Sequence, residues 1–261
     1  MRTYPQKERY DSADLREIIQ ILRAPDGCPW DREQTHASIR NNFIEECYEA
    51  VEAIDTGDNA LLTEELGDVL MQVYLHAQMA QEENAFSLDD VVDGICKKLL
   101  YRHPHVFGDV NAENGEQALA SWDEAKRKSK GQALGSVPMH GVSKTLPALM
   151  RAQKVQKKAR LAGMDFPDTA ACAAKLREEL DELNEALRGH GSVQEELGDI
   201  LFTAVNAARL AGFEAEELLT RSTEKFISRF ERLEGLIDKP LADYSPEEQD
   251  KLWEQSKSAV N

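Results

Sequence analysis

Apolar residues recur along most of the chain at intervals of three or four positions, which is the pattern of amphipathic helices. The first such segment covers residues 14–23, and its apolar positions are Leu15, Ile18, Ile19 and Leu22. It stops before the sequence Pro25-Asp26-Gly27, whose residue types favour a turn. This pattern predicts a helix over residues 14–23.

Three more helices are predicted in the first half of the sequence, at residues 35–54, 61–82 and 87–102. Ser87 and Asp90 form the S-x-x-D pattern of a helix N-terminus. The alternating pattern of strands is hard to find anywhere in the chain. We therefore predict an all-α protein, and the short connections between helices favour domains that resemble four-helix bundles.

The helical pattern is interrupted at residues 129–148, where Gly, Pro and Ser are frequent. A chain of 261 residues is long enough for two domains. We therefore predict one helical domain at residues 1–130, a linker at 131–148 and a second helical domain at 149–261.

Two acidic motifs occur in the same order in both halves of the chain. The motif EExxExxE at residues 45–52 matches residues 178–185, and EELGD at residues 64–68 matches residues 195–199. Basic and tryptophan-containing pairs then follow in both halves: Lys98 and Arg102 match Lys225 and Arg229, and Trp122 and Lys126 match Trp253 and Lys257. Because four features recur in one order, we predict a tandem duplication of one domain.

The negative net charge of the chain argues against polyanionic binding partners. The chain has 31 Lys and Arg against 48 Asp and Glu, a formal charge of −17. Residues 1–130 hold 14 basic and 26 acidic residues (−12), and the remainder holds 17 and 22 (−5). Both halves therefore repel polyanions, and we expect neither a nucleic acid nor a membrane as a partner.

The location of the protein follows from what the sequence lacks. No run of about 20 apolar residues could span a membrane, and the first residues have no apolar core of a secretion signal. The four cysteines form no C-x-x-C pair. We expect a cytoplasmic protein whose cysteines are reduced and mostly buried.

The repeated acidic motifs are the candidate chemistry. Glu46 and Glu49 lie three residues apart on one face of a helix, and so do Glu65 and Asp68 on the next. Their counterparts in the second half are Glu179, Glu182, Glu196 and Asp199. Facing carboxylates ~4 Å apart repel each other by roughly 4 kcal/mol per pair at an effective dielectric constant of ~20. Such a group needs solvent or a counter-charge.

A solvated surface is the simplest explanation for one EExxE motif in so acidic a chain. The fixed order of both motifs argues against it. So does the position of Glu65 and Asp68 beside an apolar stripe that we expect to face the core, formed by Leu66, Val69 and Leu70. Carboxylates on the inward side of a helix favour a metal site.

The residue types limit which metal would bind. Oxygen ligands without His or Cys favour Mg²⁺, with Mn²⁺ as a substitute. The rival is a di-iron site, which needs Glu-x-x-His on each of two helices, and the pair Glu33 and His36 has no counterpart in the second half. Magnesium held by carboxylates is typical of enzymes that act on phosphate esters and anhydrides.

The repeated basic and aromatic residues could complete a nucleotide site. Lys225 and Arg229 lie one helical turn apart and could bind phosphates. Trp253 could stack on a base, with Lys257 one turn later meeting a phosphate. A solvated basic stripe and a packed tryptophan are the alternatives for these residues taken alone.

Four motifs in this chain have a fixed order: EExxE followed by ExxD, DGCPWDREQTH at residues 26–36, YRHPHVF at residues 101–107, and the basic stretch RAQKVQKKA at residues 151–159. Together they resemble the MazG family of nucleoside triphosphate pyrophosphohydrolases. The resemblance covers almost the whole chain. It implies an all-α homodimer that hydrolyses NTPs and dNTPs to monophosphate and pyrophosphate, with Mg²⁺ and with broad base tolerance.

The resemblance also implies roles for individual residues. In the second half it implies metal ligands at Glu179, Glu182, Glu196 and Asp199, with Glu178 near the attacking water, and nucleotide contacts at Lys225, Arg229, Trp253 and Lys257. Glu178, Glu179 and Glu182 are thus the candidate catalytic residues. In the first half the matching positions are Glu46, Glu49, Glu65 and Asp68 for metal, and Lys98, Arg102, Trp122 and Lys126 for nucleotide.

Two functional hypotheses remain open at this stage. The first is a pyrophosphohydrolase whose C-terminal half carries most of the activity, because the resemblance includes some two-domain relatives that are active in that half only, and because its charge repels a triphosphate less. The second is a non-catalytic helical module that senses nucleotides or binds a partner, because a duplicated copy is free to lose turnover.

Overall fold

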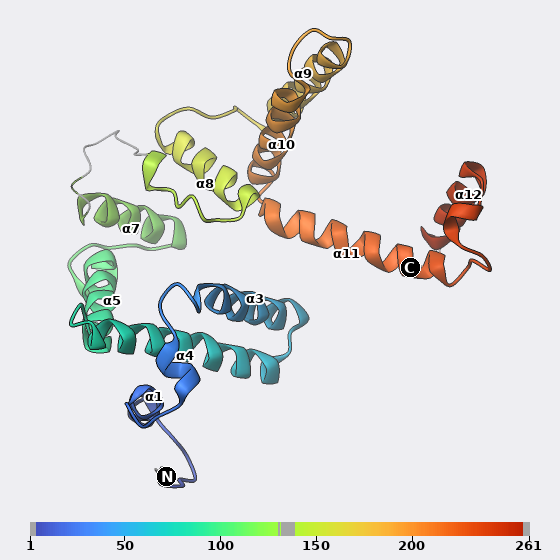
Figure 1. The fold of residues 1–261 in the computed structure, drawn as a ribbon. Coiled ribbons are helices and arrows are strands. Elements are labelled where there is room, and N and C mark those ends of the chain that lie inside the picture. Colours follow the sequence, from blue (N-terminus) through green and yellow to red (C-terminus); the bar gives the residue numbers. More distant parts are fainter. Residues whose placement is uncertain (1–3, 130, 132–138, 258–261) are drawn as a thin grey trace. The chain divides into compact units, whose positions relative to one another are not determined.

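The computed structural model describes residues 4–129, 131 and 139–257, which form helices and no strands. The chain divides into two compact units, Met1–Lys130 and Gly131–Asn261. Figure 1 shows the helices of both units along the sequence. The prediction of an all-α fold in tandem copies is confirmed. Within the predicted linker 131–148, residues 132–138 lie outside the described residues.

The first unit is built on an antiparallel pair of helices, α3 and α4, against which α1 packs. Its core contains Ile19, Ile39, Leu75 and Met79. The helices in order are α1 (Ser12–Arg23), α2 (Pro29–Glu33), α3 (Arg40–Thr56), α4 (Asn59–Glu82), α5 (Leu88–Arg102), α6 (Pro104–Phe107) and α7 (Gly115–Ser129).

Local sequence signals explain where these helices begin and end. Ser87 and Asp90 form the predicted capping box at the start of α5. Gly57 ends α3 in a left-handed conformation (φ 70°), and Asp58 accepts hydrogen bonds from the first backbone amides of α4. The two-residue connection therefore turns the chain back sharply and fixes the antiparallel pairing of α3 with α4.

One predicted boundary is wrong. The helix expected from residue 35 begins at Arg40. Thr35 and Ser38 exchange hydrogen bonds between their hydroxyl groups and backbone amides, which stabilises a turn in place of a first helical turn. The sequence-based boundary failed because the side chains of Ser and Thr compete with backbone helix bonds.

The second unit repeats the antiparallel pair with α9 and α10, and α8 packs against α10 and α11. Two buried glutamines anchor α8: Gln153 donates to the Phe213 carbonyl at 2.9 Å, and Gln156 donates to the Phe202 carbonyl at 2.7 Å. The elements in order are η1 (Met139–Gly141), α8 (Ala148–Leu161), α9 (Thr169–Leu187), α10 (Val193–Leu210), α11 (Ala215–Glu234), η2 (Leu241–Asp243) and α12 (Pro246–Lys257).

Two of the three residues in the apolar stripe beside the acidic motif do not face a core within their own unit, whereas Val69 has intermediate burial. Leu66 is 53% exposed and Leu70 is 44% exposed, so the expectation that they are core-facing is wrong. Their counterparts Leu197 and Leu201 are exposed as well. The reason is that too few helices surround each antiparallel pair to cover both of its sides.

Two further expectations concern the burial of the cysteines and the absence of a membrane-spanning helix. Cys172 is buried, whereas Cys47 and Cys96 are exposed and Cys28 is intermediate, so the cysteines are not mostly buried. Among the described residues, none of the helices has both the length and the hydrophobicity of a membrane span.

Candidate functional site

The second unit gathers acidic residues from α9 and α10. Glu179, Glu196 and Asp199 each place one carboxylate oxygen within 4.8 Å of those of the other two. Glu179 is only 5% exposed, which is rare for a glutamate side chain. The structure thus brings together three of the four predicted metal ligands of this half.

Glu182, the fourth predicted ligand, lies beside this group rather than in it. Burial raises the pKa of its carboxyl group, and repulsion from Glu179 and Glu196 adds to that rise, while Lys175 opposes it. The carboxyl group of Glu182 therefore interacts electrostatically with the cluster.

Lys175 is the member of this site that sequence reasoning missed. Its Nζ lies 2.7 Å from Oε1 of Glu178 and 3.0 Å from Oε1 of Glu179. These two carboxylates raise the pKa of the lysine and hold it charged. The available signal was the spacing, because a Lys three and four residues before two Glu on a helix reaches both.

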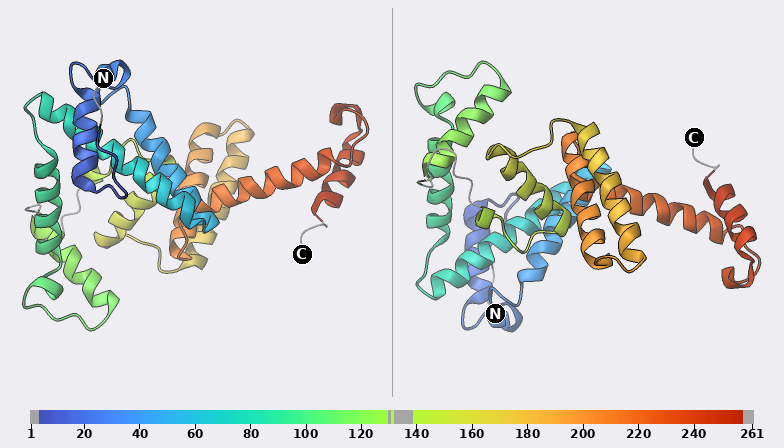
Figure 2. Two further views of the ribbon diagram at one scale, coloured as in Figure 1. Left: turned by 90° about the horizontal axis from the view of Figure 1, so that it is seen from below. Right: turned by 90° about the horizontal axis from the view of Figure 1, so that it is seen from above.

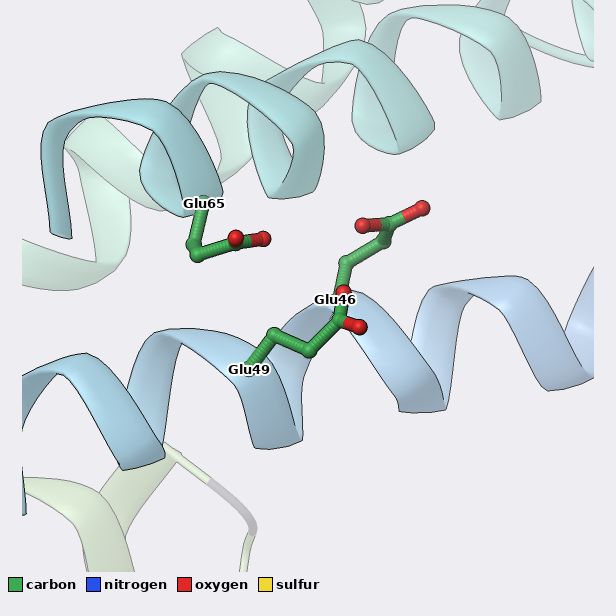
Figure 3. A group of neighbouring side chains, drawn as sticks. All are labelled: Glu46, Glu49 and Glu65. Atoms are coloured by element: carbon green, nitrogen blue, oxygen red, sulfur yellow. The ribbon is translucent and has the colours of Figure 1, made fainter. Parts of the chain in front are cut away.

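The first unit gathers the corresponding residues from α3 and α4. Carboxylate oxygens of Glu46, Glu49 and Glu65 lie within 4.8 Å of one another. Figure 3 shows Glu65 reaching from one helix toward Glu46 and Glu49 on the other. The amide Nε2 of Gln72 donates to Oε1 of Glu46 at 3.4 Å.

Burial and mutual repulsion perturb this cluster. Burial raises the pKa of Glu46, with repulsion from Asp68 and Glu49 adding to it against the hydrogen bond from Gln72. Burial also raises the pKa of Glu65, followed by repulsion from Glu49 and Asp68. Asp68 thus acts on the cluster electrostatically, although it does not belong to the group of close oxygens.

Both clusters fit a hard divalent cation. Each consists of carboxylate oxygens only, and no histidine belongs to either group. His36, the residue on which a di-iron site would depend, instead places its Nδ1 2.7 Å from Nδ1 of His76. Oxygen-only ligands that repel one another favour an ion of the Mg²⁺ type over iron, zinc or copper.

The predicted nucleotide residues form separate groups in the two units. In the first unit, the Arg102 guanidinium carbon lies 5.4 Å from the centre of the Trp122 ring, and Nζ of Lys126 lies 4.4 Å from it. In the second, the ring of Trp253 on α12 lies 5.2 Å from that of Phe226 on α11. Lys98 and Lys225 are exposed on their helices, and Lys257 pairs with Glu254.

Within one unit the structure does not bring the predicted nucleotide-binding residues close to the carboxylate cluster. Glu196 lies 14 residues before the end of α10, roughly 20 Å at 1.5 Å per residue. From that end α11 runs on, with α12 at its far end, as Figures 1 and 2 show. In the first unit, Glu65 is likewise near the start of α4, whereas α5 and α7 follow its end.

Comparison with known proteins agrees with this architecture. The MazG nucleotide pyrophosphohydrolase domain matches residues 34–107 and 168–233, one match in each unit. The chain is 41% identical to "Nucleoside triphosphate pyrophosphohydrolase/pyrophosphatase MazG" of Thermotoga maritima over 94% of both chains. It is 40% identical to "Nucleoside triphosphate pyrophosphohydrolase" of Escherichia coli strain K12, over 93% of this chain and 95% of that protein.

A third relative is longer than this chain. "Uncharacterized protein YabN" of Bacillus subtilis is 45% identical over 95% of this chain, which spans 52% of YabN. Each acidic pair of helices lies within a segment that the family domain matches. The chain therefore belongs to the MazG nucleotide pyrophosphohydrolase family.

Proposed function

We propose that this chain is a Mg²⁺-dependent nucleoside triphosphate pyrophosphohydrolase, which converts NTPs and dNTPs to monophosphates and pyrophosphate. The observation that carries the proposal is the group of close carboxylates on α9 and α10, with Glu179 almost fully buried. The names of the two relatives that align end to end support the reaction.

We assign different roles in the reaction to the residues of the second unit, according to their chemistry. Glu179, Glu182, Glu196 and Asp199 would hold the metal. Bound there, Mg²⁺ would neutralise the phosphates and make a bound water more acidic. Glu178, next to Glu179 and exposed, would accept a proton from the attacking water. Lys225 and Arg229 would bind phosphate oxygens.

Broad base specificity is part of the proposal. Trp253, whose ring lies tilted against that of Phe226, would stack on the base, and stacking is tolerant of base identity because every base has a π-face. Rates with different NTPs should therefore differ less than rates between NTPs and nucleoside diphosphates.

A homodimer would bring the separated groups together. The side of the α9–α10 pair that carries Leu197 and Leu201 is exposed, and so are Leu219 and Phe226 on α11. Exposed apolar side chains gathered on one side of a helix pair are typical of a protein–protein interface. A second copy that covered this surface could place its α11 beside the carboxylates. Light scattering after size-exclusion chromatography measures the mass, and a monomer at micromolar concentration would contradict this part.

The decisive assay mixes the purified chain with Mg²⁺ and each common NTP, after circular dichroism has shown that it is folded. We expect nucleoside monophosphate and pyrophosphate. Nucleoside diphosphate with orthophosphate would mean that a different bond is broken. Nucleotide binding without product in single-turnover mixing would instead support the non-catalytic nucleotide-sensing module.

A further inference from the structure

Two arginines of α11 have buried nitrogen atoms that lack an acceptor. Nε of Arg229 and one terminal nitrogen of Arg232 are buried and have no hydrogen-bond partner among the described residues. In the first unit two nitrogen atoms are likewise buried without a hydrogen-bond partner among the described residues, Nε of Arg102 at the end of α5 and Nδ1 of His105 on α6. Arg229 and Arg102 are predicted nucleotide residues, but Arg232 and His105, each three residues later, are not.

The absence of partners is costly. A buried donor without an acceptor loses its bonds to water and gains none, and the penalty is larger for a charged group. Another arginine on the same helix, Arg221, forms an ion pair with Glu217. Among the described residues Arg232 forms none, although the chain contains 48 acidic residues. Within the part of the chain that the structure describes, Arg232 therefore has an unused donor that could serve an external acceptor.

The position of Arg232 indicates which acceptor. Lys225, Arg229 and Arg232 lie at positions i, i+4 and i+7 of a continuous helix, so they share one face. Phe226 and Phe230 lie on the neighbouring face, and the ring of Trp253 packs on that of Phe226. Three cations in a row beside an aromatic platform suit a chain of phosphates, and the planar guanidinium group binds two oxygens at once.

We infer that Arg232 is a further phosphate-contacting residue of the C-terminal site, extending the row formed by Lys225 and Arg229. The inference rests on the proposed function, since it names a contact of the same substrate. It adds a position to the phosphate site and makes that site longer than the Lys-x-x-x-Arg motif alone.

The test measures binding of inorganic tripolyphosphate with Mg²⁺ to the full chain by titration calorimetry. Arg232→Gln should weaken binding about tenfold or more, because a charge-assisted contact is lost. Arg160→Gln, which removes an exposed arginine of α8 away from this row, is the control and should bind like the unmodified chain. Adenosine, which has no phosphate, should bind all three proteins equally.

A second measurement needs no substitution and so does not depend on how a variant folds. Phenylglyoxal modifies accessible arginines, and peptide mass spectrometry locates each product. Tripolyphosphate with Mg²⁺ should protect Arg232 of the unmodified chain and leave the exposed Arg160 of α8 unprotected. Protection of neither, or of both equally, would overturn the inference.

The outcomes separate this inference from the proposed function. An unmodified chain that hydrolyses NTPs to pyrophosphate, while Arg232→Gln binds tripolyphosphate as tightly, overturns the inference alone. A dimer that dissociates in Arg232→Gln with unchanged affinity for tripolyphosphate also overturns it, because the acceptor is then a second copy. Tripolyphosphate binding that requires Arg232, in a chain without turnover, supports the inference and overturns the proposed function.

Discussion

The two units offer the same acidic motifs but neutralise them differently. In the second unit, Lys175 pairs with Glu178 and Glu179 at the edge of the cluster. Counting back from the matching EExxE motif, Asn42 occupies the equivalent position in the first unit. There, among the described residues, no lysine or arginine pairs with Glu46, Glu49 or Glu65.

The consequence is a difference in electrostatic strain. Burial and repulsion raise the pKa of both Glu46 and Glu65 in the first unit. In the second unit Lys175 opposes the rise at Glu182 and supplies a counter-charge to the buried Glu179. Lys175 must also release an oxygen of Glu179 if a metal takes it. The same acidic motif thus occurs with an internal cation beside it in one unit and, within the described part of the chain, without one in the other.

The largest expected effect comes from substituting two of the proposed metal ligands in one unit at a time. Glu182→Gln with Asp199→Asn should lower kcat by more than about 100-fold, since even residues that only support metal ligands cost 10–100-fold. The matching pair, Glu49→Gln with Asp68→Asn, should leave most of the turnover. Pyrophosphate release under saturating NTP measures both.

This experiment carries its own control for folding. The substitutions remove charge from a cluster that repels itself, so the melting temperature without metal should hold or rise, while the stabilisation by Mg²⁺ disappears. Equal losses of turnover from both pairs would mean two working sites or a shared one. A larger loss from the N-terminal pair would contradict the assignment to the second unit.

Much of the fold could be predicted because its signals are local. The capping box at Ser87 and the helix end at Gly57 depend on side chains within one turn, and the order of motifs revealed the duplication. The three gathered carboxylates of each unit followed from spacing along a helix and a short connection. These features need no knowledge of distant contacts.

The rest required three-dimensional information. Whether Leu66 faces a core depends on how many helices surround it, which periodicity does not report. Asp68 in one unit and Glu182 in the other lie outside the group of close oxygens, and the spacing of the motifs does not predict which carboxylate is left out. The distance between the carboxylates and Trp253 depends on the direction in which α11 leaves α10.

The next prediction concerns Lys175, the cation that lies beside the acidic cluster of the second unit and has no counterpart in the first. Lys175→Gln leaves the buried Glu179 among like charges, so without metal the melting temperature should fall by roughly 3 °C or more. Adding Mg²⁺ should reduce the difference from the unmodified chain, because the ion supplies the missing charge. Arg221→Gln, which removes an exposed pair of the same unit, should shift the melting temperature by less than about 1 °C. A fall that Mg²⁺ does not reduce would assign Lys175 a packing role.

The reciprocal change supplies the missing cation to the first unit. Asn42→Lys places an ammonium group three and four residues before Glu45 and Glu46 on α3, copying the spacing of Lys175. The melting temperature without metal should rise by about 1–2 °C, since Asn42 is exposed and the new pair is partly screened. Differential scanning calorimetry in EDTA measures it. A lower melting temperature would show that the difference between the units does not lie in this cation.

The smallest effect is the pH dependence of the metal-free chain. Glu46 and Glu65 have folded-state pKa values above the ordinary 4.5, so the folded chain binds more protons than the unfolded chain between the two values. Their contribution to stability is therefore fully present below pH 4.5 and is lost as pH rises through the folded-state pKa values. Glu46→Gln with Glu65→Gln should remove this loss, so the variant should gain on the unmodified chain as pH rises from 4.5 to 7. Urea denaturation in EDTA at several pH values measures the difference in unfolding free energy. A difference that shrinks as pH rises would mean that a counter-charge stabilises these carboxylates, and the contrast between the units would then fail.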